Sequence, residues 1–402
     1  MFRKLDEIKV LRDPVHGYIH VELQVIWDLI NSSWFQRLRR IRQLGGAYMV
    51  YHCAEHSRFS HSLGVYEIVR RIVTEIGDIE KALNEREKVT VMAAALLHDI
   101  GHGPYSHALE SVTGVSHEVF TCRIIEENTE ITRILENCSE GLAKDTADII
   151  RHRSANPLLY QLISSQLDAD RMDYLLRDAY FTGTKYGEFD LERILRTLRV
   201  EDGRLLVVKG SGVYAVENYI MARYHMYWQV YYHPTARSYE YILHALFRRI
   251  RDISSGEDDL LPLFRPLVNK KKISLDDYFK LDENSVSFGF EKLTEHPDPV
   301  IRDLSLRVRD RKLFAYADSS PGGNRKIRNR LRNEGYDLKY YFGRDTVAQN
   351  PYIPYNGDHN EAIWVRMSDG SIRELSNASN IVYSLIHGPA HDDNKVFFPE
   401  DK

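Results

Sequence analysis

The sequence predicts a mainly helical protein with a short N-terminal β-hairpin and a smaller C-terminal region of mixed helices and strands. Apolar residues recur at helical spacing through most of residues 25–250. Alternation typical of strands is confined to the first 25 residues, to a short segment near residue 205, and to residues 336–375. A polar segment at residues 254–259 separates a core at residues 1–250, hairpin included, from an α+β region at residues 251–402.

Each element follows from a local pattern. Two apolar segments flank the turn sequence at residues 13–17, which predicts the hairpin. Apolar residues at helical spacing predict a helix over residues 25–44, ended by Gly45 and Gly46. The same criterion predicts helices over residues 62–76, 85–97, 117–128, 131–138, 144–152 and 158–180, and several long helices within residues 213–250. Shorter helices are expected to residue 315, then strands with a hairpin turn at residues 368–371, and a mobile tail over the last dozen residues.

The composition argues against several classes of protein. Lys and Arg total 54 against 58 Asp and Glu, so the net charge of −4 provides no overall attraction for nucleic acid. No apolar run approaches the roughly 18 to 20 residues of a membrane span, and the first ten residues lack a signal-peptide core, so we expect a cytoplasmic protein. Three widely spaced cysteines without a CxxC motif fit reduced thiols.

The residues with the strongest chemical signal lie between Leu96 and His107, where an apolar helix meets glycines and a proline that end helices. Adjacent His98 and Asp99 offer a nitrogen and an oxygen ligand for a divalent transition metal. Alone, such a pair is equally typical of a buried histidine held by an aspartate. His61 and the carboxylates of residues 168–178 add candidate ligands on other helices.

His61, His98-Asp99 and Asp170 resemble, in order and context, the H…HD…D metal signature of the HD-domain superfamily. The segments that resemble its dNTP triphosphohydrolase branch, which includes the vertebrate enzymes with a sterile-alpha-motif and bacterial homologues, are residues 13–17, 35–39, 43–45, 58–64, 98–107 and 168–178. The likeness extends over about residues 5–320. It implies one transition-metal ion on these four residues, with Fe, Mn, Zn and Ni as candidates, and additional Mg with the nucleotide.

The resemblance also implies roles for residues beside the metal. His107 would be the general acid, His117 would be hydrogen-bonded to Glu110, and His102 would contact phosphate. Vertebrate members have aspartate where this chain has Glu110. Without the family, His117 followed by Glu118 would be an ordinary helix start.

A third set implied by the resemblance binds substrate: Gln43, Leu44, Arg58, Arg171, Tyr174, Asp178, Arg223 and Tyr231. The three arginines would hold phosphates. Gln43, Tyr174 and Asp178 would bind the 3′-hydroxyl. Leu44 and Tyr231 would crowd the 2′ position and so favour deoxynucleotides, although Tyr231 could equally be a core residue.

Positions where the family binds an activating nucleotide between the subunits of a tetramer are Lys9, Val10, Asn31, Gln36 and Arg39. GTP and dGTP are the candidate activators, and a homotetramer is implied. The arginines of this segment are also typical of a solvated helical face. Residues beyond about 320 match nothing in the family, and we expect the C-terminal region to serve assembly or regulation.

The function predicted is hydrolysis of a dNTP by water to a deoxynucleoside and inorganic triphosphate. Two alternatives remain open at this point. Another HD phosphohydrolase, such as a nucleotidase or cyclic-nucleotide phosphodiesterase, would share the metal ligands but would not need Gln43, Leu44 and Tyr231. A nucleotide-sensing regulator would keep the site as a vestige.

Overall fold

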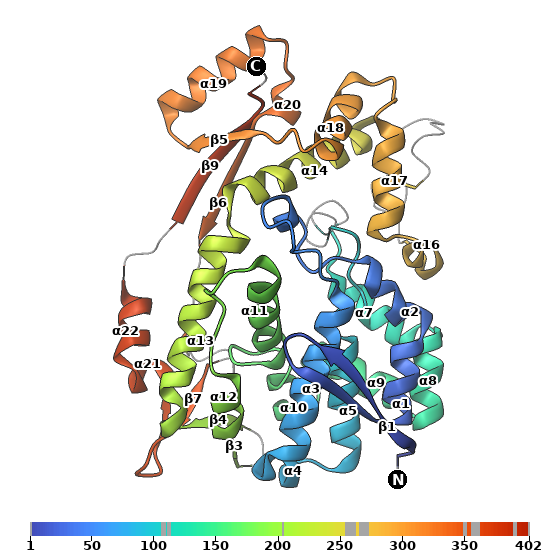
Figure 1. Cartoon of the computed structure of the whole chain (residues 1–402), viewed down its shortest axis with the longest axis vertical. Helices are drawn as coiled ribbons and strands as arrows, with labels where there is room; N and C mark the ends of the chain where they lie inside the picture. The colour runs from blue at the N-terminus through green and yellow to red at the C-terminus, as the bar shows by residue number, and fades with distance from the viewer. Residues whose placement is uncertain are drawn as a thin grey trace.

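The computed structural model describes residues 2–105, 110, 114–202, 205–253, 263–264, 273–348, 352–354, 362–388 and 392–400. Helices dominate, a two-stranded sheet precedes them, and two small sheets involve the C-terminal region, so the predicted fold class is confirmed (Figure 1). The polar segment at residues 254–259 lies outside the described residues. No helix in the described ranges combines the length and the apolar character needed to cross a bilayer.

The N-terminal hairpin is confirmed, since β1 (Lys4–Asp13) pairs antiparallel with β2 (Gly17–Leu23). The helices that follow are α1 (Gln24–Asn31), α2 (Ser33–Arg37), α3 (Arg58–Glu75), α4 (Gly77–Ala82), α5 (Glu85–Leu97), α7 (His117–Glu126), α8 (Glu130–Cys138), α9 (Leu142–Ile150), α10 (Pro157–Gln161), α11 (Ala169–Thr182) and α12 (Leu191–Thr197). Helix α5 is the centre of the core. Its last nine residues, from Val89 onward, are all buried, which explains why it lacks a polar face.

Two predicted long helices are interrupted because polar side chains cap new ones. Ser32 ends α1 and accepts a hydrogen bond from the Phe35 amide, so the predicted helix over residues 25–44 becomes two helices and a short 3₁₀ turn. The Asp168 side chain accepts hydrogen bonds from the backbone amides of Ser165 and Arg171. It therefore caps α11 and separates it from α10 within the predicted helix over residues 158–180.

The second half of the chain adds two sheets and more helices. Its elements are β3 (Leu198–Glu201), β4 (Leu205–Lys209), α13 (Val213–Met226), the π-helical turn η4 (Tyr227–Tyr231), α14 (Pro234–Ile253), α16 (Leu275–Phe279), α17 (Glu283–Leu293), α18 (Pro299–Arg309), β5 (Ala315–Asp318), α19 (Pro321–Asn333), α20 (Leu338–Tyr341), β6 (Gly343–Ala348), β7 (Trp364–Arg366), β8 (Ile372–Glu374), α21 (Leu375–Ala378), α22 (Asn380–His387) and β9 (Asp392–Phe398). The hairpin turn predicted at residues 368–371 is confirmed between β7 and β8.

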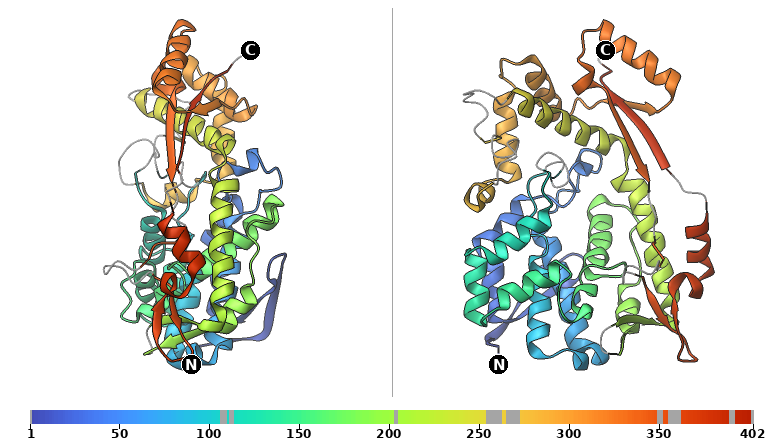
Figure 2. Two further views of the ribbon diagram at one scale, coloured as in Figure 1. Left: turned by 90° about the vertical axis from the view of Figure 1, so that its left-hand side faces the viewer. Right: turned by 180° about the vertical axis from the view of Figure 1, so that it is seen from behind.

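The expectation of a mobile C-terminal tail is wrong. Strand β9 is the central strand of the sheet β5-β9-β6, which lies beside α14 (Figure 2). Val396 and Phe397 are fully buried, so this short apolar segment is stabilised by packing that its polar neighbours in the sequence do not reveal. A second sheet, β3-β4-β7-β8, pairs β7 in parallel with β4 and so joins the C-terminal region to the helical core.

Close approach of α3 and α11 depends on Gly64. A Cβ there would lie 1.8 Å from Asp173 Oδ1 and 2.5 Å from Arg177 Nη2, both buried polar atoms. We therefore expect Gly64→Ala to lower the free energy of unfolding by about 1–3 kcal/mol, measured by urea denaturation.

Gly322→Ala in α19 is the matched control, because nothing lies within 4 Å of its added Cβ. It should leave stability unchanged or raise it by up to about 1 kcal/mol. Equal effects of the two substitutions would contradict the packing argument.

Candidate metal centre and active site

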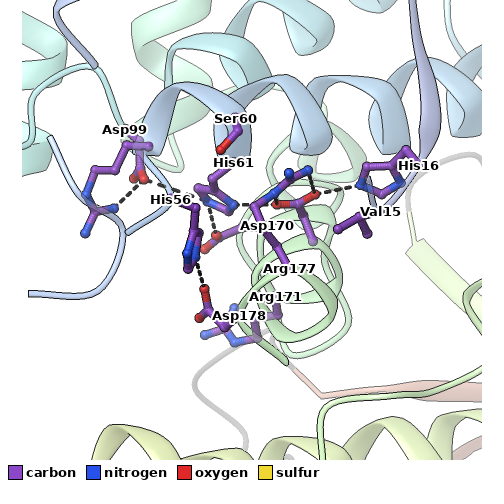
Figure 3. Close-up of polar contacts among 12 residues, drawn as sticks. Val15, His16, His56, Ser60, His61, Asp99, Asp170, Arg171, Arg177 and Asp178 are labelled. Carbon is purple, nitrogen blue, oxygen red and sulfur yellow. Dashed lines mark hydrogen bonds and ion pairs between the residues drawn. The ribbon is translucent and has the colours of Figure 1, made fainter. Parts of the chain in front are cut away.

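Three helix ends bring the four predicted metal ligands together. His61 lies in the first turn of α3, His98 and Asp99 directly follow α5, and Asp170 lies in the first turn of α11. His61 Nε2 is 3.1 Å from Asp170 Oδ1 and 3.7 Å from Asp99 Oδ2 (Figure 3). His98 Nε2 is 3.4 Å from Asp99 Oδ1 and 3.7 Å from Asp170 Oδ1. Ligand atoms that share one ion at about 2.1 Å are separated by about 3–3.5 Å, so the four residues fit a single metal.

Hydrogen bonds direct both histidine Nε2 atoms into the cluster. His61 Nδ1 donates to Asp173 Oδ2 at 2.8 Å, and His98 Nδ1 donates to the Ala95 carbonyl at 2.8 Å. Each Nε2 then carries a lone pair, and both are buried without a hydrogen-bond partner. Lone pairs of nitrogen and carboxylate oxygen therefore face one another, an arrangement that a cation stabilises.

The pKa values of the cluster residues also indicate that this site favours positive charge. Burial opposes protonation of His61, but the nearby carboxylates of Asp170 and Asp173 outweigh burial and raise its pKa to about 10. The pKa of Asp170 is lowered, because the nearby imidazoles of His61 and His98 outweigh the cost of burying its charge. A divalent ion would replace the proton that this environment attracts, so its binding releases protons.

A second layer of buried residues supports His61. Asp173 also accepts a hydrogen bond from His16 Nε2 at 2.6 Å and two from Arg177, and Arg177 in turn contacts Asp13 at 2.8 Å. The turn of the N-terminal hairpin is thereby attached to α11 behind the metal ligands (Figure 3). We did not identify His16 from the sequence, although it lies in one of the segments that resemble the family.

Beside the metal ligands, two histidine rings stack. The rings of His102 and His117 are 3.7 Å apart at 16°, and His117 Nδ1 contacts Glu110 Oε1 at 2.5 Å. Burial and the nearby Arg58 guanidinium lower the pKa of His102, so it is neutral at physiological pH. Arg58 Nη1 donates to Asp99 at 2.5 Å. His107, expected to be the general acid, lies outside the described residues.

A cavity of about 570 Å³ opens from this cluster. The predicted site residues that line it are Gln43, Leu44, Arg58, Asp99, His102, His117, Asp170, Tyr174, Asp178 and Tyr231. Arg171 and Arg223 do not line it. Arg171 instead contacts Asp168 and the Ser165 carbonyl, whereas Arg223 has buried Nε and Nη1 atoms with no hydrogen-bond partner.

Tyr231 and Asp178 form a rigid pair in the cavity wall. Tyr231 donates its hydroxyl to Asp178 Oδ2 at 2.8 Å, and His56 Nε2 holds Oδ1 at 2.7 Å. The Tyr174 and Tyr231 rings meet edge to face at 6.0 Å. Burial raises the pKa of the Tyr231 hydroxyl, which therefore stays protonated and a donor. His56 was missed from the sequence because nothing local distinguishes it.

The residues expected to bind an activator lie on the hairpin, on α1 and α2, and on the short 3₁₀ turn that follows α2, outside this cavity. Val10 is 53% exposed on β1 and Asn31 is exposed at the end of α1. Gln36 accepts a hydrogen bond from Arg39 Nε at 2.8 Å, and the Arg39 guanidinium lies 3.6 Å above the Phe59 ring. Lys9 forms an ion pair with Glu7 at 3.2 Å.

Comparison with known proteins places the site in a family. The model of the HD domain matches residues 58–178, and that of the HD-associated region matches residues 189–320. The uncharacterized protein YwfO of Bacillus subtilis is 43% identical, over 99% of this chain and 94% of that protein. The human deoxynucleoside triphosphate triphosphohydrolase SAMHD1 is 28% identical, over 81% of this chain and 57% of that protein.

A solved structure extends the likeness to the whole fold. The crystal structure of a phosphohydrolase from Bacteroides thetaiotaomicron has a TM-score of 0.84 and 30% identity, and the match covers 98% of this chain and all of that one. All four metal-ligand candidates lie within the range matched by the HD-domain model. The chain therefore belongs to the HD-domain family.

Proposed function

We propose that this protein is a metal-dependent dNTP triphosphohydrolase. Water attacks the α-phosphorus, the bond from phosphorus to the 5′ oxygen breaks, and the products are a deoxynucleoside and inorganic triphosphate. The observation that carries the proposal is that one cavity is lined both by Asp99 and Asp170 of the ligand cluster and by the Tyr231–Asp178 pair. The likeness to SAMHD1 supports the same reaction.

The four-residue cluster would hold one divalent transition ion, with Fe, Mn, Zn and Ni as candidates and Mg accompanying the nucleotide. Such an ion, when bound, polarises a phosphoryl oxygen and lowers the pKa of the attacking water. His102, neutral and buried, contacts phosphate. His117 is oriented by Glu110, and His107 donates the proton to the leaving 5′ oxygen.

Arginines neutralise the triphosphate. Arg58 already lies beside the cluster through its bond to Asp99. The buried Arg223 nitrogens that lack hydrogen-bond partners are suited to an anionic ligand, and Arg171 would exchange part of its contact with Asp168 for phosphate.

The sugar is held between two sets of side chains. Gln43, Tyr174 and Asp178 bind the 3′-hydroxyl, while Leu44 and Tyr231 occupy the space that a 2′-hydroxyl would need. Because the Tyr231 ring is fixed through Asp178, it cannot easily move aside for a ribonucleotide.

A nucleotide activator would regulate the activity. GTP or dGTP would bind between subunits of a homotetramer at Lys9, Val10, Asn31, Gln36 and Arg39. The region of residues 251–402 would contribute to assembly or regulation.

The reaction is tested by incubating the purified, metal-loaded protein with each dNTP, with and without GTP or dGTP, and resolving the products by chromatography. Inorganic triphosphate and deoxynucleoside in equal amounts are expected. Release of only single phosphate or pyrophosphate would indicate a different phosphohydrolase, and binding without turnover would indicate a nucleotide sensor.

Removing one ligand should remove metal and activity together. Asp170→Asn keeps the shape of the side chain but weakens its charge interaction with a cation, so we expect bound metal to fall at least tenfold, with turnover lost. Metal content is measured by inductively coupled plasma mass spectrometry. The control is Asp28→Asn, a substitution at an exposed position of α1. An Asp170→Asn protein that retains both metal and turnover would exclude Asp170 as a ligand.

The Tyr231 ring should determine the choice of sugar. Tyr231→Ala opens the 2′ space, and we expect the ratio of kcat/KM for dNTP over NTP to fall roughly tenfold or more. Tyr231→Phe keeps the ring and loses only the bond to Asp178, so it should retain most of the selectivity. Unchanged selectivity in Tyr231→Ala would assign this ring to the core.

A further inference from the structure

The C-terminal sheet forms part of the cavity wall. Side chains alternate along β6, where Asp345 and Val347 line the cavity and the intervening Thr346 is exposed. Strand β6 extends toward the junction of α13 and α14 (Figure 1). The C-terminal region thus contributes directly to the cavity that holds the proposed active site.

A buried arginine attaches β6 at this position. Arg237 Nε donates to Asp345 Oδ2 at 2.7 Å and its Nη1 donates to Asp393 Oδ2 at 2.5 Å. Its Nη2 reaches the backbone carbonyls of the same two residues at 3.3 and 3.5 Å. Because these bonds occupy most of the guanidinium donors, Arg237 serves as a clamp on β6 and β9 and has little capacity left for a substrate.

Aromatic contacts connect the sugar pocket to this strand. Tyr231, held by Asp178, packs edge to face on Tyr227 at 5.0 Å, and Tyr227 packs on Tyr232 at 5.4 Å. Tyr232 donates its hydroxyl to the carbonyl of Ala348 in β6 at 3.3 Å. A nucleotide with its phosphates at the metal cluster and its sugar at Asp178 and Tyr231 would therefore direct its base toward β6.

We propose that Asp345 and Val347 are specificity-determining residues that contact the nucleobase and favour guanine over thymine. This inference rests on the proposed function. The Asp345 side chain is 41% exposed, and a carboxylate has about four lone-pair sites, of which the Arg237 clamp uses one. Guanine presents two adjacent N–H groups that match a carboxylate. Thymine presents one N–H between two carbonyl oxygens, which a carboxylate repels. Val347 supplies an apolar contact for the base beside Asp345.

The test measures binding of α,β-imido analogues of dGTP and dTTP by calorimetry, on the full, metal-loaded chain with saturating GTP. GTP fills any activator site, so that only the cavity responds. We expect the dGTP analogue to bind roughly tenfold more tightly than the dTTP analogue. Asp345→Asn should abolish this preference, and the ratio of kcat/KM for dGTP over dTTP should fall in parallel.

Asp393→Asn is the matched control. It removes the other carboxylate of the Arg237 clamp, but among the described residues Asp393 is not part of the cavity lining. It should keep the guanine preference. Equal binding of the two analogues to the unmodified chain, no binding of either, or an equal effect of Asp345→Asn and Asp393→Asn would overturn the inference. Products other than triphosphate would contradict the proposed function alone, because the binding ratio does not depend on the reaction.

Discussion

The buried carboxylate of Asp173 is the interaction on which the rest of the site depends. It accepts hydrogen bonds from His16 of the hairpin turn, from His61 of α3 and from Arg177 one turn further along α11. An ionised carboxylate with no exposed surface is stable only with such partners, so three elements must meet at this point. Gly64 has no side chain, and this leaves the space that Asp173 and Arg177 occupy.

From this anchor the properties of the metal centre follow. Because His61 Nδ1 donates its proton in a hydrogen bond to Asp173, His61 Nε2 faces Asp99 and Asp170. Carboxylates and lone pairs gathered in a buried space favour a cation, which is the condition for activating water beside a polyanionic substrate. The same helix, α11, carries Asp170, Tyr174 and Asp178 on successive turns, so the ligand cluster and the proposed sugar pocket keep a fixed separation.

Much of the site could be predicted from the sequence because its signals are local. Adjacent His98 and Asp99 at the end of an apolar helix, and the regularly spaced carboxylates of α11, mark positions that the structure brings together. The helix interruptions at Ser32 and Asp168 could not be predicted from the sequence, because those side chains are compatible with either a helix interior or a cap. His16 and His56 have partners 157 and 122 residues away, respectively, and no local pattern identifies such contacts.

The helical class and the hairpin could be predicted from the sequence because periodicity is a property of short segments. The four metal-ligand candidates followed from the resemblance to the HD-domain signature. Three features could be established only from the tertiary structure: strand β9 is buried in a sheet, β6 lines the cavity through Asp345, and Arg237 clamps both strands. These features depend on contacts between residues 108 and 156 positions apart, where burial and charge pairing outweigh the polar character of the local sequence.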